Sequence, residues 1–153
     1  MATHISEIND LFMTLTSDHK LTAIFTTSGS AGLNTYLESW LLFSIRDFSD
    51  ICDQSLVYSK TTQTFSVDLS DKNMTVLAQI MTRYWLERTV NDLQQINNYI
   101  QDKDFKMHSA AQNLKEKKDL LILKVELIDR LLGSYSLKVN DWDSWYLQNF
   151  AGG

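Results

Sequence analysis

The amino-acid sequence predicts an all-α fold, a helical bundle with one long helix pair and an extended aromatic C-terminal arm. The 153-residue chain contains no proline and five glycines, and long helices are the structures that tolerate an absence of proline best. Apolar residues recur at spacings of three and four along most of the chain, which indicates amphipathic helices. Hydrophobic residues make up 44% and charged residues 22%, a composition typical of one globular domain.

The N-terminal half predicts two helices joined by a loop. The first helix covers about residues 4–16, where Ile5, Ile8 and Phe12 share one face. A flexible loop is expected over 26–32, because this segment combines small residues with two glycines. The second helix covers about residues 33–57, and its apolar stripe is wide enough to touch two neighbours.

The C-terminal half predicts a long antiparallel pair of helices. Residues 58–69 are expected mainly as a loop, although the alternation over 64–69 also suits a lone extended arm or half of a hairpin. The third helix runs from about 71 to 101, with Ser70 as its N-cap. The fourth runs over about 109–132 and is expected to end at Gly133. We therefore divide the chain into a bundle domain, 1–133, and a C-terminal arm, 134–153.

Charge and hydropathy exclude several classes of protein. Lys and Arg number 14 against 19 Asp and Glu, giving a net charge of −5, whereas dedicated nucleic-acid binders usually carry a basic excess. The N-terminus lacks the basic and apolar regions of a signal peptide. The apolar runs are far shorter than the roughly 20 residues of a membrane helix. We therefore expect a soluble protein without a membrane partner.

No motif predicts catalysis. Cys52 lies on the apolar stripe of the second predicted helix, far in sequence from all three histidines, and we expect it to be a small core residue. The glycine-rich segment 29–32 lacks the Lys-Ser/Thr that follows the last glycine of a phosphate-binding loop, so we interpret it as a plain loop. We expect no enzymatic activity and no cofactor.

Candidate metal ligands and charge clusters are also weak. His4 and Glu7 share a helix face without an evident third ligand. The pair Asp102 and Asp104 opens like a calcium loop, but the required glycine and the bidentate glutamate are missing. The mixed charges of 115–119 are explained by ion pairs along one helix face. We expect no metal site.

The C-terminal arm is the strongest candidate for a binding site. It contains Tyr135 and four further aromatic residues that would share one side if the segment is helical, namely Trp142, Trp145, Tyr146 and Phe150. These side chains either pack onto the chain's own bundle or dock onto another subunit. We predict docking, with these four residues as the interface, because Trp and Tyr are enriched among interface anchors.

Several segments resemble small helical virion proteins of tailed bacteriophages, found among head and neck components. The resemblance spans roughly residues 7–137. It is carried by Glu7-Ile8-Asn9-Asp10-Leu11-Phe12, by Tyr36-Leu37 through Phe48, by Phe65-x-x-Asp68-Leu69-Ser70 and Met81-Thr82-Arg83-Tyr84-Trp85-Leu86, and by Asp104-Phe105, Ser109-Ala110-Ala111-x-x-Leu114 and Tyr135-Ser136.

The resemblance implies a structural protein of the virion, assembled in the host cytoplasm. It implies a head-to-tail adaptor of the phage neck that binds the portal protein and other neck or tail subunits. Such an adaptor forms a homo-oligomeric, dodecameric ring through which DNA passes without specific binding. Two alternatives remain open at this point: another capsid-associated virion protein, or a soluble helical regulatory module that binds one partner protein through the arm.

Overall fold

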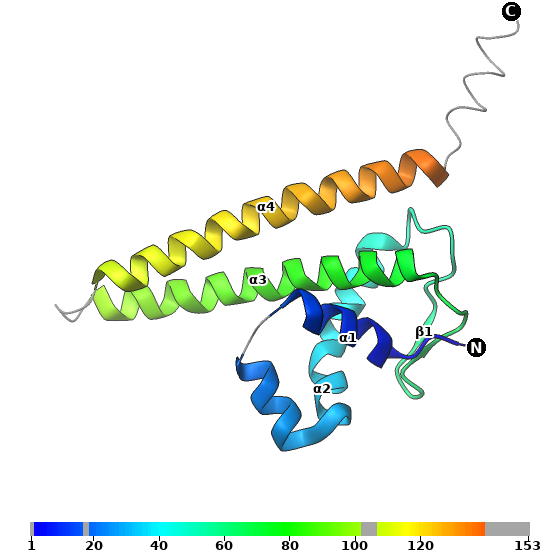
Figure 1. The fold of residues 1–153 in the computed structure, drawn as a ribbon, viewed down its shortest axis with the longest axis horizontal. Coiled ribbons are helices and arrows are strands. Elements are labelled where there is room, and N and C mark those ends of the chain that lie inside the picture. The colour runs from blue at the N-terminus through cyan, green and yellow to red at the C-terminus, as the bar shows by residue number, and fades with distance from the viewer. Residues whose placement is uncertain (1, 17–18, 102–106, 140–153) are drawn as a thin grey trace, which may run out of the picture.

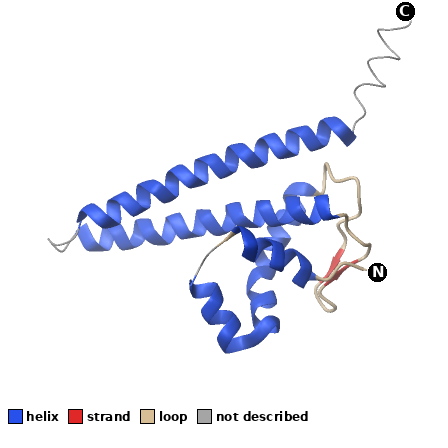
Figure 2. Ribbon diagram, in the orientation of Figure 1, coloured by secondary structure: helices blue, strands red, loops and turns tan. Residues whose placement is uncertain are grey.

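The computed structural model describes residues 2–16, 19–101 and 107–139, and this part of the chain is mainly helical, as predicted. Figure 2 shows helices throughout, with two very short strands at one end. The elements in chain order are α1 (Ile5–Leu15), α2 (His19–Phe48), β1 (Tyr58–Ser59), β2 (Thr64–Phe65), α3 (Asp71–Gln101) and α4 (Met107–Val139).

Helix α3 is the centre of the arrangement. It packs against α1, α2 and α4. Figure 1 shows α3 and α4 side by side as a long hairpin, while α1 and the first part of α2 lie on the side of α3 away from α4 and the end of α2 passes behind α3. Helices α1 and α2 cover only one end of the hairpin, so its far end extends beyond them (Figure 1).

Helix α1 begins and packs as its sequence predicts. His4 caps it: the His4 Nδ1 accepts from the Ser6 amide at 3.1 Å, and the Glu7 carboxylate accepts from the His4 amide at 3.1 Å. Ile5, Ile8 and Phe12 are fully buried. The candidate ligands His4 and Glu7 therefore serve as helix caps.

The segment 58–69 forms a small hairpin. Tyr58 pairs with Phe65 in an antiparallel register, and the chain just before α1 lies along β2. The Phe65 amide donates to the Thr3 carbonyl at 2.9 Å, and the buried Thr3 hydroxyl accepts from the Leu69 amide at 2.7 Å. Apart from these two short strands the segment is loop, as expected, and of the alternatives left open the hairpin is the one observed.

The predicted loop over 26–32 is observed only as a break at Gly29, where two helical segments meet. Helix α2 runs through this segment, and Gly29 alone leaves the helical conformation, at φ 65° and ψ −168°. This left-handed φ favours glycine. A Cβ on Gly32 would lie 2.2 Å from the Ser28 Cβ, so the second glycine permits a close approach across the bend. The two glycines build a tight kink in place of a flexible connection.

The predicted end of the second helix at 57 was wrong. Helix α2 ends at Phe48, and the following turn brings Cys52 and Asp53 toward α4, where the Asp53 amide donates to the Tyr135 hydroxyl at 3.2 Å. Cys52 therefore lies after the helix. It still packs, partly exposed, against the hydrophobic core.

Helix α3 spans the residues that the sequence predicts. The Ser70 hydroxyl accepts from the Asn73 amide at 3.3 Å, which confirms Ser70 as the N-cap. The buried residues of α3 face α1 and α2 as well as α4. They include Val76, Leu77, Ile80, Met81 and Trp85.

The predicted end of the fourth helix at Gly133 was wrong, because α4 continues to Val139. A glycine in a helix interior costs only about 0.5–1 kcal/mol relative to alanine. Beyond it, Tyr135 continues the buried face that includes Ile128, and it is 1% exposed. Burial of this large ring outweighs the weak local preference of Gly133 to stop the helix. The division of the chain at 133 thus falls inside α4.

Candidate functional site

The four predicted interface residues, Trp142, Trp145, Tyr146 and Phe150, lie outside the described residues, so their docking role stays a prediction. The fifth aromatic residue of the predicted arm does not share that role. Tyr135 is buried against the Phe48 ring in an edge-to-face contact, with ring centroids 5.0 Å apart. It belongs to the core of the bundle.

A polar cluster surrounds the Tyr135 hydroxyl at the end of the bundle. The hydroxyl lies within hydrogen-bonding distance of the Asp53 carboxylate and of the Asn73 side-chain oxygen, 2.7 Å away, and these two acceptors share its single proton. The Asn73 amide nitrogen donates to Asp53 at 2.9 Å and to the Gln54 side-chain oxygen at 2.7 Å. The Lys72 ammonium lies 3.8 Å from the centre of the Tyr135 ring. The cluster thus joins the loop after α2, the first turn of α3 and the last turns of α4.

The charges in this cluster are set by hydrogen bonding and burial. The hydrogen bond from Tyr135, followed by the one from Asn73, holds the pKa of Asp53 below its usual value. Burial and the Asp53 hydrogen bond raise the pKa of Tyr135. Burial also raises the pKa of the Cys52 thiol, which disfavours the reactive thiolate. The cluster therefore suits a structural tie between segments better than nucleophilic chemistry.

Helix α4 has a second apolar face that the structure leaves exposed. Its buried face, which includes Leu114, Ile128 and Tyr135, points into the bundle. Another set of leucines lies about 120° around the helix, as the 3.6-residue repeat requires. We name this set the outer stripe. It consists of Leu120, Leu123 and Leu127, which are 44%, 63% and 51% exposed.

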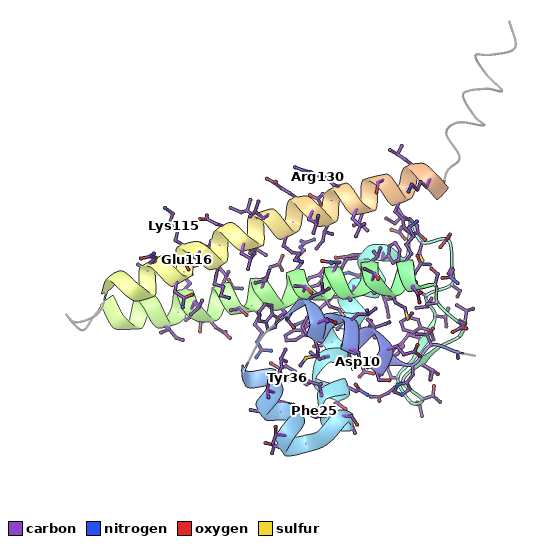
Figure 3. The ribbon with its side chains drawn as sticks, in the orientation of Figure 1. Asp10, Phe25, Tyr36, Lys115, Glu116 and Arg130 are labelled. Atoms are coloured by element: carbon purple, nitrogen blue, oxygen red, sulfur yellow. The ribbon has the colours of Figure 1, made fainter. Side chains whose placement is uncertain are left out.

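The outer stripe is flanked and interrupted by charged residues. Figure 3 shows Lys115, Glu116 and Arg130 along α4 on either side of this stretch. Arg130 pairs with Glu126 one turn earlier, with 3.8 Å between their charged atoms. Three half-exposed leucines on successive turns of one helix are typical of a surface that contacts another protein.

The outer stripe was missed by sequence reasoning, although its signal is present. The run Leu120-Leu121-Ile122-Leu123 places apolar side chains around most of the helix circumference, more than one neighbour can cover. Only the position of α3 shows which of these residues are left exposed. Leu121 is half-buried, whereas Ile122 is 57% exposed.

Of the remaining metal candidates, Asp102 and Asp104 lie outside the described residues. No three side chains of the His, Cys, Asp and Glu types gather as metal ligands would in residues 2–16, 19–101 and 107–139. Over the same ranges, the helices lack a stretch of the length and hydropathy needed to cross a membrane. Comparison of the chain with protein-family models, curated proteins and solved structures found no match.

Proposed function

We propose that this chain is a non-enzymatic assembly protein, a head-to-tail adaptor of a tailed-bacteriophage neck. The observation that carries the assembly role is the outer stripe, an apolar surface on a 33-residue helix whose separate buried face already packs on α3. An apolar surface of this kind is stabilised when another protein covers it. The phage-neck assignment rests on the sequence resemblance.

In the proposed assembly, the long hairpin of α3 and α4 forms the wall of a homo-oligomeric ring. Copies of one chain form a closed ring when the rotation between neighbours closes on itself. The net charge of −5 would help DNA to pass the channel without adhering. Residues 140–153, with their four aromatic side chains, would anchor the ring to the portal protein.

The portal contact is tested by native mass spectrometry of the full chain mixed with the portal protein encoded by the same genome. We compare it with a chain that ends at Val139, the last residue of α4, and with the Trp142→Ser, Trp145→Ser double variant. The full chain should bind in several copies per portal ring. Because truncation of an aromatic hot spot costs about 2 kcal/mol or more, each tryptophan substitution should weaken binding roughly thirtyfold.

The outcomes separate the candidate functions. Equal binding by the full and the shortened chain would mean that residues 140–153 are not the anchor. A full chain that stays monomeric beside the portal protein would contradict the adaptor role. A complex that holds a single copy of the chain and a different partner would favour the regulatory module.

A further inference from the structure

The outer stripe has the spacing of a coiled-coil seam. Leu120, Leu123 and Leu127 are separated by three and then four residues, which matches the alternating spacing of seam positions in paired helices. Continuing the same spacing gives Arg130, Ser134 and the exposed Leu137. The apolar part of the seam is therefore short and is centred on Leu123.

The two edges of the stripe carry opposite charges. At 100° per residue, Asp119 and Glu126 lie along one edge, while Lys117 and Lys124 lie along the other. In paired helices these flanking positions select the partner and its direction. The acidic edge and the basic edge of one helix are therefore complementary to each other.

We propose that a second copy of this chain covers the outer stripe, with the two α4 helices parallel. In a parallel pair, the acidic edge of each helix lies beside the basic edge of its neighbour. Facing residues are offset by five positions, so Asp119 of each copy faces Lys124 of the other. In an antiparallel pair, like edges meet, and acid faces acid while lysine faces lysine. The inference rests on the proposed assembly function and specifies its partner and direction.

The environment of Lys124 supports this pairing. Its side chain is half-buried beside α3, where its ammonium donates to the uncharged Gln79 side chain at 2.8 Å. Burial without a compensating charge lowers its pKa. A carboxylate from Asp119 of a second copy would place an opposite charge at the solvent side of this ammonium.

The proposed contact between two outer stripes is small and joins only two copies of the chain. A pair built from the same stripe on both copies is self-complementary and stops at two, so a ring would need a second, different contact between such pairs. Three leucines per copy form a limited interface, and we expect reversible association at micromolar concentrations or weaker.

The direction of the pair is tested by disulfide cross-linking in a Cys52→Ala background. Single cysteines replace Leu120 or Leu127, which are one heptad and about 10 Å apart along the helix. A parallel pair brings each position next to itself, so each variant should form a disulfide-linked homodimer under mild oxidation. The matched control is Ile122→Cys, which is similarly exposed but lies on the other side of α4 and should not cross-link.

Three other outcomes of the cross-linking experiment would each overturn the inference. Disulfides that form only in a mixture of the Leu120→Cys and Leu127→Cys chains would show an antiparallel pair. Yields no higher than that of Ile122→Cys would show that no second copy covers the stripe. Cross-links that form only after removal of residues 140–153 would show that the chain's own C-terminal segment covers it.

Charge reversal provides a second test of the parallel register. Asp119→Lys and Lys124→Glu should each weaken dimerisation roughly tenfold in sedimentation equilibrium, because each creates two like-charge contacts per pair. Combining them should restore association, since the complementary pair is rebuilt in reverse. Both variants keep residues 140–153, so portal binding can survive when dimerisation fails, and the two proposals fail separately.

Discussion

Replacement of Tyr135 by phenylalanine isolates the hydroxyl that joins α4 to the rest of the bundle. The substitution preserves the ring, its contact with Phe48 and its position over Lys72. It removes the hydrogen bonds to Asp53 and Asn73. Any loss of stability therefore reports the polar cluster, because the apolar packing of the ring is unchanged.

The size of the effect follows from the burial of the partners. Asp53 is exposed, so water can replace its lost hydrogen bond, whereas Asn73 is fully buried. Leaving a buried acceptor without its donor costs about 1–3 kcal/mol. We expect Tyr135→Phe to lower the free energy of unfolding by about 2 kcal/mol, and to lower Tm by about 4–8 °C.

The assay is urea unfolding followed by circular dichroism, with Tyr58→Phe as the matched control. Tyr58 donates to the half-exposed Glu38 carboxylate at 3.0 Å, and this solvent-accessible contact should cost less than about 1 kcal/mol. If Tyr135→Phe unfolds within about 0.5 kcal/mol of the natural chain, the hydrogen bonds of the Tyr135 hydroxyl do not hold α4 to the bundle, and the stabilising role given to the polar cluster is wrong.

Three further predictions concern the backbone at two glycines, the Asp53 carboxylate and the Cys52 thiol. Gly133→Ala should stabilise the fold by about 0.5–1 kcal/mol, because an added Cβ meets nothing within 4 Å. Gly29→Ala should destabilise the fold by about 1 kcal/mol, because the backbone there has φ 65°. Equal shifts of Tm in the two variants would contradict both predictions. The pKa of Asp53 is lower in the folded chain than in the unfolded chain. Its carboxylate therefore stabilises the fold at any pH above the unfolded-state pKa, and this stabilisation is lost as pH falls through the folded-state pKa. Urea midpoints measured down the acid range should fall less steeply in Tyr135→Phe than in the natural chain. Cys52→Ala should cost about 1 kcal/mol and leave portal binding unchanged, and loss of binding with intact folding would show a chemical role for the thiol.

Local signals were sufficient where neighbouring residues decide the structure. Ser70 and the apolar spacing that follows it specify α3 without information from elsewhere in the chain. The same kind of signal found the break at Gly29 but overstated its length, and it failed at Gly133, where local preference favours an end to the helix. At Gly29 the chain bends and the helix resumes, and at Gly133 the helix continues because Tyr135 is buried among partners more than 60 residues away in sequence.

The candidate site was predictable only in part for the same reason. The aromatic residues of 140–153 were conspicuous in the sequence because their side chains are large and unusual. The outer stripe was not, because leucines facing α3 and leucines facing outward follow the same periodicity. Only the three-dimensional position of α3 separates Leu121, which is half-buried, from Leu123, which is 63% exposed.

The most direct test of the adaptor role is the copy number of this chain in purified virions, measured by quantitative mass spectrometry against the portal subunit. A ring of the proposed kind is stacked on the portal, so we predict equal numbers of the two chains. We also predict that the chain stays with the neck when heads and tails are separated. Its absence from virions, or a copy number unrelated to that of the portal protein, would contradict the account.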